Sequence, residues 1–156
     1  MSDTFITSDQ HFGHKADWLP KVLKLNRVCF SGVQRAPDAD VRLRFNSPDC
    51  SVFILRTSLD ELLGFAICES RGPEVHLWSI AVKEEHRGHN LGGYLLDEAR
   101  QYYQELGGYD VISLNVHVDN IPAIHLYERL GFRKVSVLKR WFLQDGDGIR
   151  MIKELI

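Results

Sequence analysis

Hydrophobic residues recur at helical spacing in the first third of the chain. Over residues 16–30, apolar side chains return every three or four positions, which predicts an amphipathic helix. Pro20 would fall in the first turn of this helix, where its missing N–H is harmless. A second helix is expected to begin near Pro37, and Asn46-Ser47-Pro48 marks its end.

The middle of the chain changes to short apolar runs rich in β-forming residues. These runs predict three strands, at residues 51–56, 62–69 and 75–82. Ser58-Leu59-Asp60 lies between the first two runs and is typical of a hairpin turn. The order therefore predicts an antiparallel meander after the two helices.

A helical period returns after a polar, glycine-containing stretch. It predicts a helix over residues 91–106, which Gly107-Gly108 ends. A strand is expected at residues 111–118, followed by a helix at residues 120–130 with Pro122 in its first turn. This strand–helix–strand–helix unit follows the meander and is typical of an α/β domain with a mixed sheet.

The C-terminal segment predicts a closing hairpin. Residues 132–142 and 149–156 are expected as strands, and Asp145-Gly146-Asp147-Gly148 supplies hairpin turn chemistry between them. The whole pattern indicates an α/β fold with a mixed sheet of about six to seven strands flanked by helices. We expect residues 1–156 to form one domain, with residues 1–15 either a tail or a first strand and loop.

Composition narrows the partners only slightly. A formal net charge of −2 and a pI near 6.4 show no basic surplus for nucleic acid. No apolar run approaches the ~20 residues that span a bilayer, and the N-terminus does not resemble a signal peptide. Cys29, Cys50 and Cys68 are expected to be small buried hydrophobes in a reducing compartment. We therefore expect a cytoplasmic protein, monomeric or homodimeric, with no membrane or nucleic-acid partner.

A strand, a glycine-containing loop and a helix follow one another after Val82. Loops of this kind present backbone N–H groups at a positive helix terminus and can hold phosphates. Gly88, Gly92 and Gly93 would let the backbone approach a ligand closely. Glycines before a helix also occur as simple turn residues, so this segment alone leaves both interpretations open.

A second motif makes the phosphate interpretation more specific. The spacing N-x-x-A-x-x-x-Y-x-x-x-G-F is met by Asn120, Ala123, Tyr127, Gly131 and Phe132. Together with Arg87–Gly92, which matches Q/R-x-x-G-x-G/A in all but one position, it resembles the GNAT acetyltransferases. The resemblance covers about Phe30 to the C-terminus, and the protein N-terminal acetyltransferases look most similar.

One position departs from the family pattern. Asn90 replaces the middle glycine of the first motif. Asparagine tolerates left-handed backbone conformations better than other non-glycine residues. We therefore expect the loop to keep its shape.

The resemblance implies a GNAT-type domain in which two splayed strands form a cleft for acetyl-CoA, the co-substrate. Ile80 and Val82 should pair with the pantetheine arm like an added strand, and the loop should cradle the pyrophosphate. Tyr127 should act as general acid toward the leaving thiolate. The binding residues that the resemblance implies are Ile80, Ala81, Val82, Arg87, Gly88, His89, Asn90, Leu91, Gly92, Gly93, Asn120 and Tyr127.

A general base is harder to assign, because Asn115 occupies the position where related enzymes place a Glu or His. His76 is the first candidate catalytic base, on the expectation that its side chain shares a strand face with Trp78 and Ile80. An imidazole titrating near pH ~6.5 would suit proton removal around neutrality.

Two alternatives to His76 stay open. His117 lies two residues beyond Asn115 on the same strand face, and Glu74 could act through water. A lone histidine on a strand is also often structural.

A separate signal lies near the N-terminus. Asp9, His11 and His14 resemble the first metal motif, D-x-H-x-G-H, of calcineurin-like phosphoesterases. The further ligand motifs of those enzymes are missing from the sequence. We therefore treat the match as chance and expect no metal site.

The predicted function is transfer of acetyl from acetyl-CoA to a primary amine, with a protein or peptide N-terminus as the acceptor. A small-molecule amine remains an alternative acceptor, since fold does not fix substrate. A CoA-binding module without turnover and a metal-dependent phosphoesterase are the competing function classes.

Overall fold

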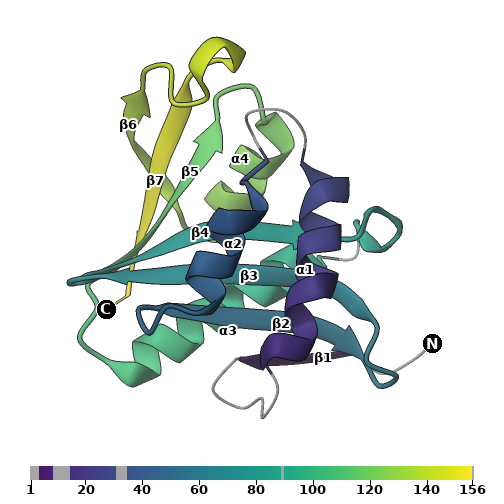
Figure 1. The fold of residues 1–156 in the computed structure, drawn as a ribbon. Coiled ribbons are helices and arrows are strands. Elements are labelled where there is room, and N and C mark those ends of the chain that lie inside the picture. Colours follow the sequence, from purple (N-terminus) through teal and green to yellow (C-terminus); the bar gives the residue numbers. More distant parts are fainter. Residues whose placement is uncertain (1–3, 9–14, 31–34, 89, 156) are drawn as a thin grey trace.

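The fold comes from a computed structural model and is described for residues 4–8, 15–30, 35–88 and 90–155. Seven strands and four α-helices make up this part of the chain (Figure 1). In order they are β1 (Thr4–Ser8), α1 (Lys15–Cys29), α2 (Asp38–Phe45), β2 (Cys50–Thr57), β3 (Leu62–Arg71), β4 (Glu74–Val82), α3 (Leu91–Leu106), β5 (Val111–His117), α4 (Ile121–Arg129), β6 (Arg133–Leu138) and β7 (Gly148–Glu154). Short 3-10 turns, η3 and η4, cover Glu84–His86 and Leu143–Asp145.

The strands form one mixed sheet in the order β1-β2-β3-β4-β5-β7-β6. Every neighbouring pair is antiparallel except β4 and β5, which run parallel. The α/β prediction and the mixed sheet are confirmed. β1 shows that residues 4–8 are the first strand rather than part of a tail.

Two hydrophobic cores hold helices against opposite faces of the sheet. On one face, α1 and α2 contribute residues such as Val22, Val41 and Phe45. On the other, α3 and α4 contribute residues such as Leu95 and Tyr127 (Figure 1). The apolar periodicity of the sequence determines which side of each helix is buried, because an amphipathic helix packs its apolar side against the sheet.

The sheet forks between β4 and β5. Their pairing runs from Glu74↔Val111 to Leu77↔Leu114 and stops there. Beyond Leu77, β4 continues to pair with β3 as far as Val82, while β5 continues with β7 as far as His117. The fork leaves the β5-facing edge of the second half of β4 without strand pairing among the described residues.

A β-bulge in β4 overturns one expectation. The β3–β4 register shifts so that Ile67 faces Ser79 and Cys68 faces Leu77, which leaves Trp78 as an extra residue. An extra residue reverses the alternation of side chains beyond it. Ile80 therefore packs with the α3–α4 core, whereas Trp78 packs with the α1–α2 core. The prediction that Ile80 shares a face with His76 and Trp78 is wrong.

Pro20 lies beyond the first turn of α1, inside the helix, which corrects the predicted position. Both Pro20 and Ala16 are exposed. The carbonyl of Ala16, which loses its N–H partner at Pro20, can therefore be satisfied by water.

The predicted strand over residues 132–142 ends at Leu138. Asp147 Oδ1 accepts a hydrogen bond from the backbone N–H of Arg140 at 2.8 Å, and Arg140 has a positive φ of 53°. The short carboxylate side chain thus caps a local turn that competes with strand pairing. Trp141 and Phe142 lie in this turn, and Gly148 already belongs to β7.

The described residues hold no cluster of three or more His, Cys, Asp or Glu that could bind a metal ion. Asp9, His11 and His14 lie outside the described residues. No helix in the described part of the chain is both long and apolar enough to cross a membrane.

Candidate active site

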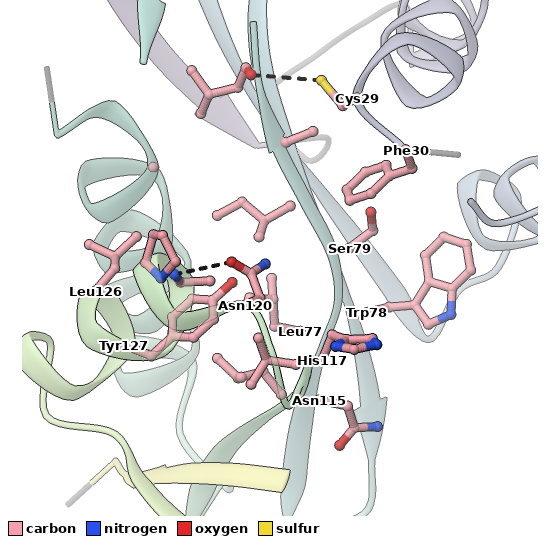
Figure 2. Close-up of a pocket in the computed structure, with 18 of the residues that line it drawn as sticks. Cys29, Phe30, Leu77, Trp78, Ser79, Asn115, His117, Asn120, Leu126 and Tyr127 are labelled. Carbon is pink, nitrogen blue, oxygen red and sulfur yellow. Dashed lines mark hydrogen bonds between the residues drawn. The ribbon is translucent and has the colours of Figure 1, made fainter. Parts of the chain in front are cut away.

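A cleft of about 1030 Å³ opens at the fork between β4 and β5. Figure 2 shows Asn120, Leu126 and Tyr127 on one side of it, and Trp78, Ser79 and Phe30 on the other. The predicted site residues that line it are His76, Ile80, Ala81, Val82, Arg87, Gly88, Asn90, Leu91, Gly92, Gly93, Asn120 and Tyr127. His89 lies outside the described residues. The structure thus brings two distant motifs together, while the roles of their residues remain predictions.

The glycine loop has the backbone shape that its sequence predicts. Asn90 adopts a left-handed conformation, with φ 58° and ψ 23°, and immediately precedes α3. Gly88 also has a positive φ, of 85°. The expectation that asparagine can replace glycine here is confirmed for the backbone geometry.

Two glycines, Gly92 and Gly93, lie in the first turn of α3 and line the cleft. A Cβ added to Gly92 would lie 3.9 Å from Val82 Cγ2 and 4.0 Å from Leu126 Cδ2, which are ordinary contact distances. A Cβ on Gly93 would lie only 2.6 Å from Asn90 Oδ1. The backbone at Gly92 is therefore open to a ligand between β4 and α4, and its N–H lies in the positively polarised turn of a helix.

Arg87 is tied back to the end of β4. Its Nε donates to the carbonyl oxygen of Val82 at 3.0 Å, and its Nη2 donates to Cys29 Sγ at 3.4 Å. Cys29 is only half-buried and lines the cleft, which corrects its prediction as a buried hydrophobe. Cys50 and Cys68 are buried as predicted.

Two residues of the second motif, Asn120 and Tyr127, lie on α4 or at its start and line the cleft. Asn120 Oδ1 accepts a hydrogen bond from the backbone N–H of Ala123 at 3.3 Å and so caps α4 (Figure 2). Tyr127 is buried, with 9% of its surface exposed. Burial raises the pKa of Tyr127 to about 12. The phenol therefore remains a hydrogen-bond donor across the physiological pH range.

His76 is buried at the fork, on the α1–α2 side of the sheet. Its Nδ1 lies 2.8 Å from Ser113 Oγ, on the residue directly opposite in β5. Burial, and then the positive charge of Arg71, lower the pKa of His76 to about 4. The expectation of a base titrating near 6.5 is wrong for this side chain, which stays neutral at physiological pH.

The side chains of the two alternative bases, His117 and Glu74, are both hydrogen-bonded within the protein. His117 accepts from the backbone N–H of Asp119 through Nδ1 at 3.0 Å, so its Nε2 donates to the carbonyl of Asp145 at 2.6 Å. Glu74 accepts hydrogen bonds from Ser113 and Arg150. The hydrogen bond from Arg150 lowers the pKa of Glu74. His117 lines the cleft, and with both ring nitrogens bonded it also braces the turn after β5.

Sequence reasoning missed Ser113 and Arg150. Neither belongs to a recognisable motif, and their role depends on strand pairing between residues far apart in the chain. Asn115, by contrast, lines the cleft at its predicted strand position. Its side-chain oxygen is buried and has no hydrogen-bond partner among the described residues.

Several archaeal and eukaryotic proteins are similar to this chain in sequence. An N-alpha-acetyltransferase of Sulfurisphaera tokodaii is 36% identical over 80 residues, which is 51% of this chain and 48% of that protein. N-alpha-acetyltransferase 30 of Schizosaccharomyces pombe is 30% identical over 98 residues, 60% of this chain and 65% of that protein. The chain thus spans about half the length of the archaeal relatives it matches.

Solved structures share the fold almost end to end. The ribosomal-protein-S18-alanine N-acetyltransferase from Escherichia coli superposes with a TM-score of 0.84 at 22% identity, covering 98% of this chain and 94% of that one. Arabidopsis thaliana NAA60 in complex with acetyl-CoA gives a TM-score of 0.84 at 19% identity, covering 97% and 98%. The sequence profile of the acetyltransferase (GNAT) family matches residues 19–132. Fold, cleft and profile agree, and the chain belongs to the acetyltransferase (GNAT) family.

Proposed function

We propose that this protein is an N-acetyltransferase that transfers acetyl from acetyl-CoA to a primary amine, with a protein or peptide N-terminus as the acceptor. The observation that carries the proposal is the fork of the sheet. It places an unpaired edge of β4, a glycine-rich helix N-terminus and a buried tyrosine in one cleft.

The chemical groups that line the cleft are of the types that bind acetyl-CoA. The free edge of β4 at Ile80–Val82 offers backbone groups to the amides of the pantetheine arm, in the manner of an added strand. The loop from Arg87 to Gly93 and the first turn of α3 offer N–H groups to the pyrophosphate. Gly92 supports this assignment because a Cβ there meets nothing closer than ordinary contact.

Acetyl-CoA supplies an activated acetyl group as a thioester. The lone pair of the amine nitrogen forms the new N–C bond, and the C–S bond breaks with its electron pair going to sulfur. In balance the amine loses one proton and the thiolate gains one. A phenol with a pKa of about 12 is a weaker acid than a thiol near ~8.5. We therefore assign Tyr127 a hydrogen bond that stabilises the departing thiolate, rather than complete proton transfer during bond breaking.

The side chains that line the cleft favour a peptide acceptor over a polyamine. The lining of the cleft includes Trp78, Trp141 and Phe142, and Trp141 is 54% exposed. Asp40 is the single acidic side chain among the described residues that line the cleft. A polycation would gain from several carboxylates, whereas exposed aromatic surface suits an apolar side chain of a peptide.

The experiment that tests the function measures CoA release from acetyl-CoA. A panel of peptides with free N-termini is compared with the same peptides carrying blocked N-termini, and with small amines such as spermidine. Turnover that requires a free peptide N-terminus supports the proposal. Turnover confined to small amines would contradict the peptide acceptor, and binding of acetyl-CoA with no turnover on any amine would favour a non-catalytic module.

A further inference from the structure

Ser113 is a buried polar residue at the fork between β4 and β5. Side chains in the interior of a packed sheet are usually apolar, so its hydroxyl needs an explanation. Ser113 is fully buried, and it pairs across the parallel ladder with His76, one residue before the β4–β5 pairing ends. Its hydroxyl lies 2.8 Å from His76 Nδ1 and 2.7 Å from Glu74 Oε2. Buried polar groups of this kind require hydrogen bonds to offset their desolvation.

The direction of these hydrogen bonds follows from the available protons. Arg150 donates to Glu74 through both terminal guanidinium nitrogens, and Nη1 lies 3.1 Å from Oε2. The carboxylate is therefore ionised and can only accept. Ser113 must give its one hydroxyl proton to Glu74, so the serine oxygen accepts from His76. The chain Arg150–Glu74–Ser113 thus leaves the proton of the imidazole on Nδ1.

We propose that Ser113 and Glu74 are positioning residues that fix His76 as its Nδ1–H tautomer, so that the lone pair on Nε2 accepts a hydrogen bond from the acceptor amine. The tautomer itself is independent of the reaction, whereas its use by the amine rests on the proposed function. His76 is one of the residues that line the cleft, as are Asn115 and Trp78. A fixed acceptor there orients the amine nitrogen before it attacks.

The surroundings of His76 explain why it would orient the acceptor amine rather than take up its proton. The charged groups that act on it are Glu69 and Arg71 of β3, Glu74 of β4 and Arg150 of β7, and they include both signs. Burial is the largest influence on its pKa and disfavours the imidazolium. The amine therefore arrives as the free base, having released its proton to water.

The chain permits a matched pair of substitutions at Ser113. Ser113→Thr keeps the hydroxyl, and Ser113→Val has nearly the same shape without it. Two-bond ¹H–¹⁵N spectra of histidine-labelled protein report the tautomer of each ring, and His76→Gln identifies the His76 signals by their loss. We expect the Nδ1–H pattern in the wild type and Ser113→Thr, and its loss in Ser113→Val. Ser113→Ala provides the same comparison if the larger side chains do not fit.

Steady-state kinetics then distinguish a positioning role of Ser113 from a purely structural role. Hydrogen-bond partners that orient metal-binding histidines are typically worth 10–100-fold. By analogy, Ser113→Val should lose roughly 10-fold or more in kcat relative to Ser113→Thr, with the KM for acetyl-CoA unchanged. An Nε2–H tautomer in the wild type, or equal spectra and equal kcat in the Thr and Val variants, would overturn the proposal. If the spectra show the expected tautomers but no amine is acetylated, the proposed function and the contact with the amine are both wrong. The fixing of the His76 tautomer by Ser113 and Glu74 would then still hold.

Discussion

At the scale of single residues, burial keeps both central side chains neutral. It raises the pKa of Tyr127 to about 12 and lowers the pKa of His76 to about 4. Desolvation disfavours whichever form carries charge, so an acid and a base are shifted in opposite directions by the same cause. In the proposed reaction, the phenol of Tyr127 and the imidazole of His76 would therefore both act uncharged.

Tyr127→Phe tests the donor. The variant keeps the ring and its packing but removes the hydroxyl, so kcat should fall by about 10²-fold while the affinity for acetyl-CoA stays near the wild-type value. Steady-state kinetics and calorimetry give the two quantities. A wild-type kcat with the true acceptor would remove Tyr127 from the mechanism.

The pH dependence of kcat/KM tests whether His76 removes a proton as a base. Since its pKa lies near 4, His76 is neutral throughout the range above about pH 5 and contributes no limb near 6.5. The rate should rise with pH through the pKa of the acceptor amine, and this limb should stay in place in His76→Gln. Two peptides whose amino groups differ in pKa provide the control, because the limb must move with the amine. A limb near 6.5 that disappears in His76→Gln would restore a histidine base.

Asn90 tests the loop conformation. Its φ of 58° suits glycine better than any residue with a Cβ. We expect Asn90→Gly to match or exceed the wild-type stability, and Asn90→Ala to be less stable than Asn90→Gly by about 1 kcal/mol. Urea unfolding of the three proteins measures the difference. Equal stability of the Ala and Gly variants would mean that the left-handed conformation is not maintained.

At the scale of elements, the cleft depends on how one helix begins and where one strand pairing ends. The first turn of α3 is open because Gly92 and Gly93 carry no side chains, and Asn90 Oδ1 occupies the space beside Gly93. The edge of β4 is free because its ladder to β5 stops at Leu77. Both features present backbone rather than side-chain groups, which suits phosphate and amide partners.

Gly92→Glu tests this arrangement. A carboxylate at the helix N-terminus would fill the space between Val82 and Leu126 and repel the pyrophosphate, so the affinity for acetyl-CoA should fall at least about tenfold in calorimetry. Gly92→Gln has the same shape without the charge and should bind with intermediate affinity. Gln101→Glu adds the same charge on an exposed turn of α3 and should bind like the wild type. Unchanged binding by Gly92→Glu would show that acetyl-CoA does not use this turn.

At the scale of the whole molecule, the same buried histidine links stability to pH. The folded pKa of His76 is depressed from 6.5 to about 4, so the unfolded chain binds a proton more readily than the folded protein. Its contribution is fully present above about pH 6.5 and is lost as the pH falls toward 4. The lowered pKa values of Glu69 and Glu74 act in the same direction at still lower pH.

The free energy of unfolding should therefore fall between pH 6.5 and 4, with His76 contributing on the order of 3 kcal/mol. Denaturant titrations of the wild type and His76→Gln across this range isolate the histidine, because both proteins share the carboxylates. The difference between them should shrink steadily as the pH falls. A constant difference would mean that His76 has the same pKa in the folded and unfolded states.

The sequence by itself determined the elements and the two motifs of the cleft. Local spacing fixed α3 and α4, because the apolar period, Gly107 and the Asn120 cap all act within a few residues of the chain. The left-handed conformation of Asn90 followed in the same way from the residue type. Where local turn chemistry competed with strand propensity, as at Trp141 and Phe142, the prediction was wrong.

The tertiary structure alone decided what the side chains at the fork can do. The bulge at Trp78 turns Ile80 to the opposite face of the sheet, and nothing in the local pattern announces an extra residue. His76 meets Ser113 across 37 positions of sequence, and Glu74 meets Arg150 across 76. Burial within the folded sheet is the main cause of the lowered pKa of His76, and these contacts carry the proposed tautomer. Proton positions and desolvation depend on atoms within a few ångströms in space, whatever their distance along the chain.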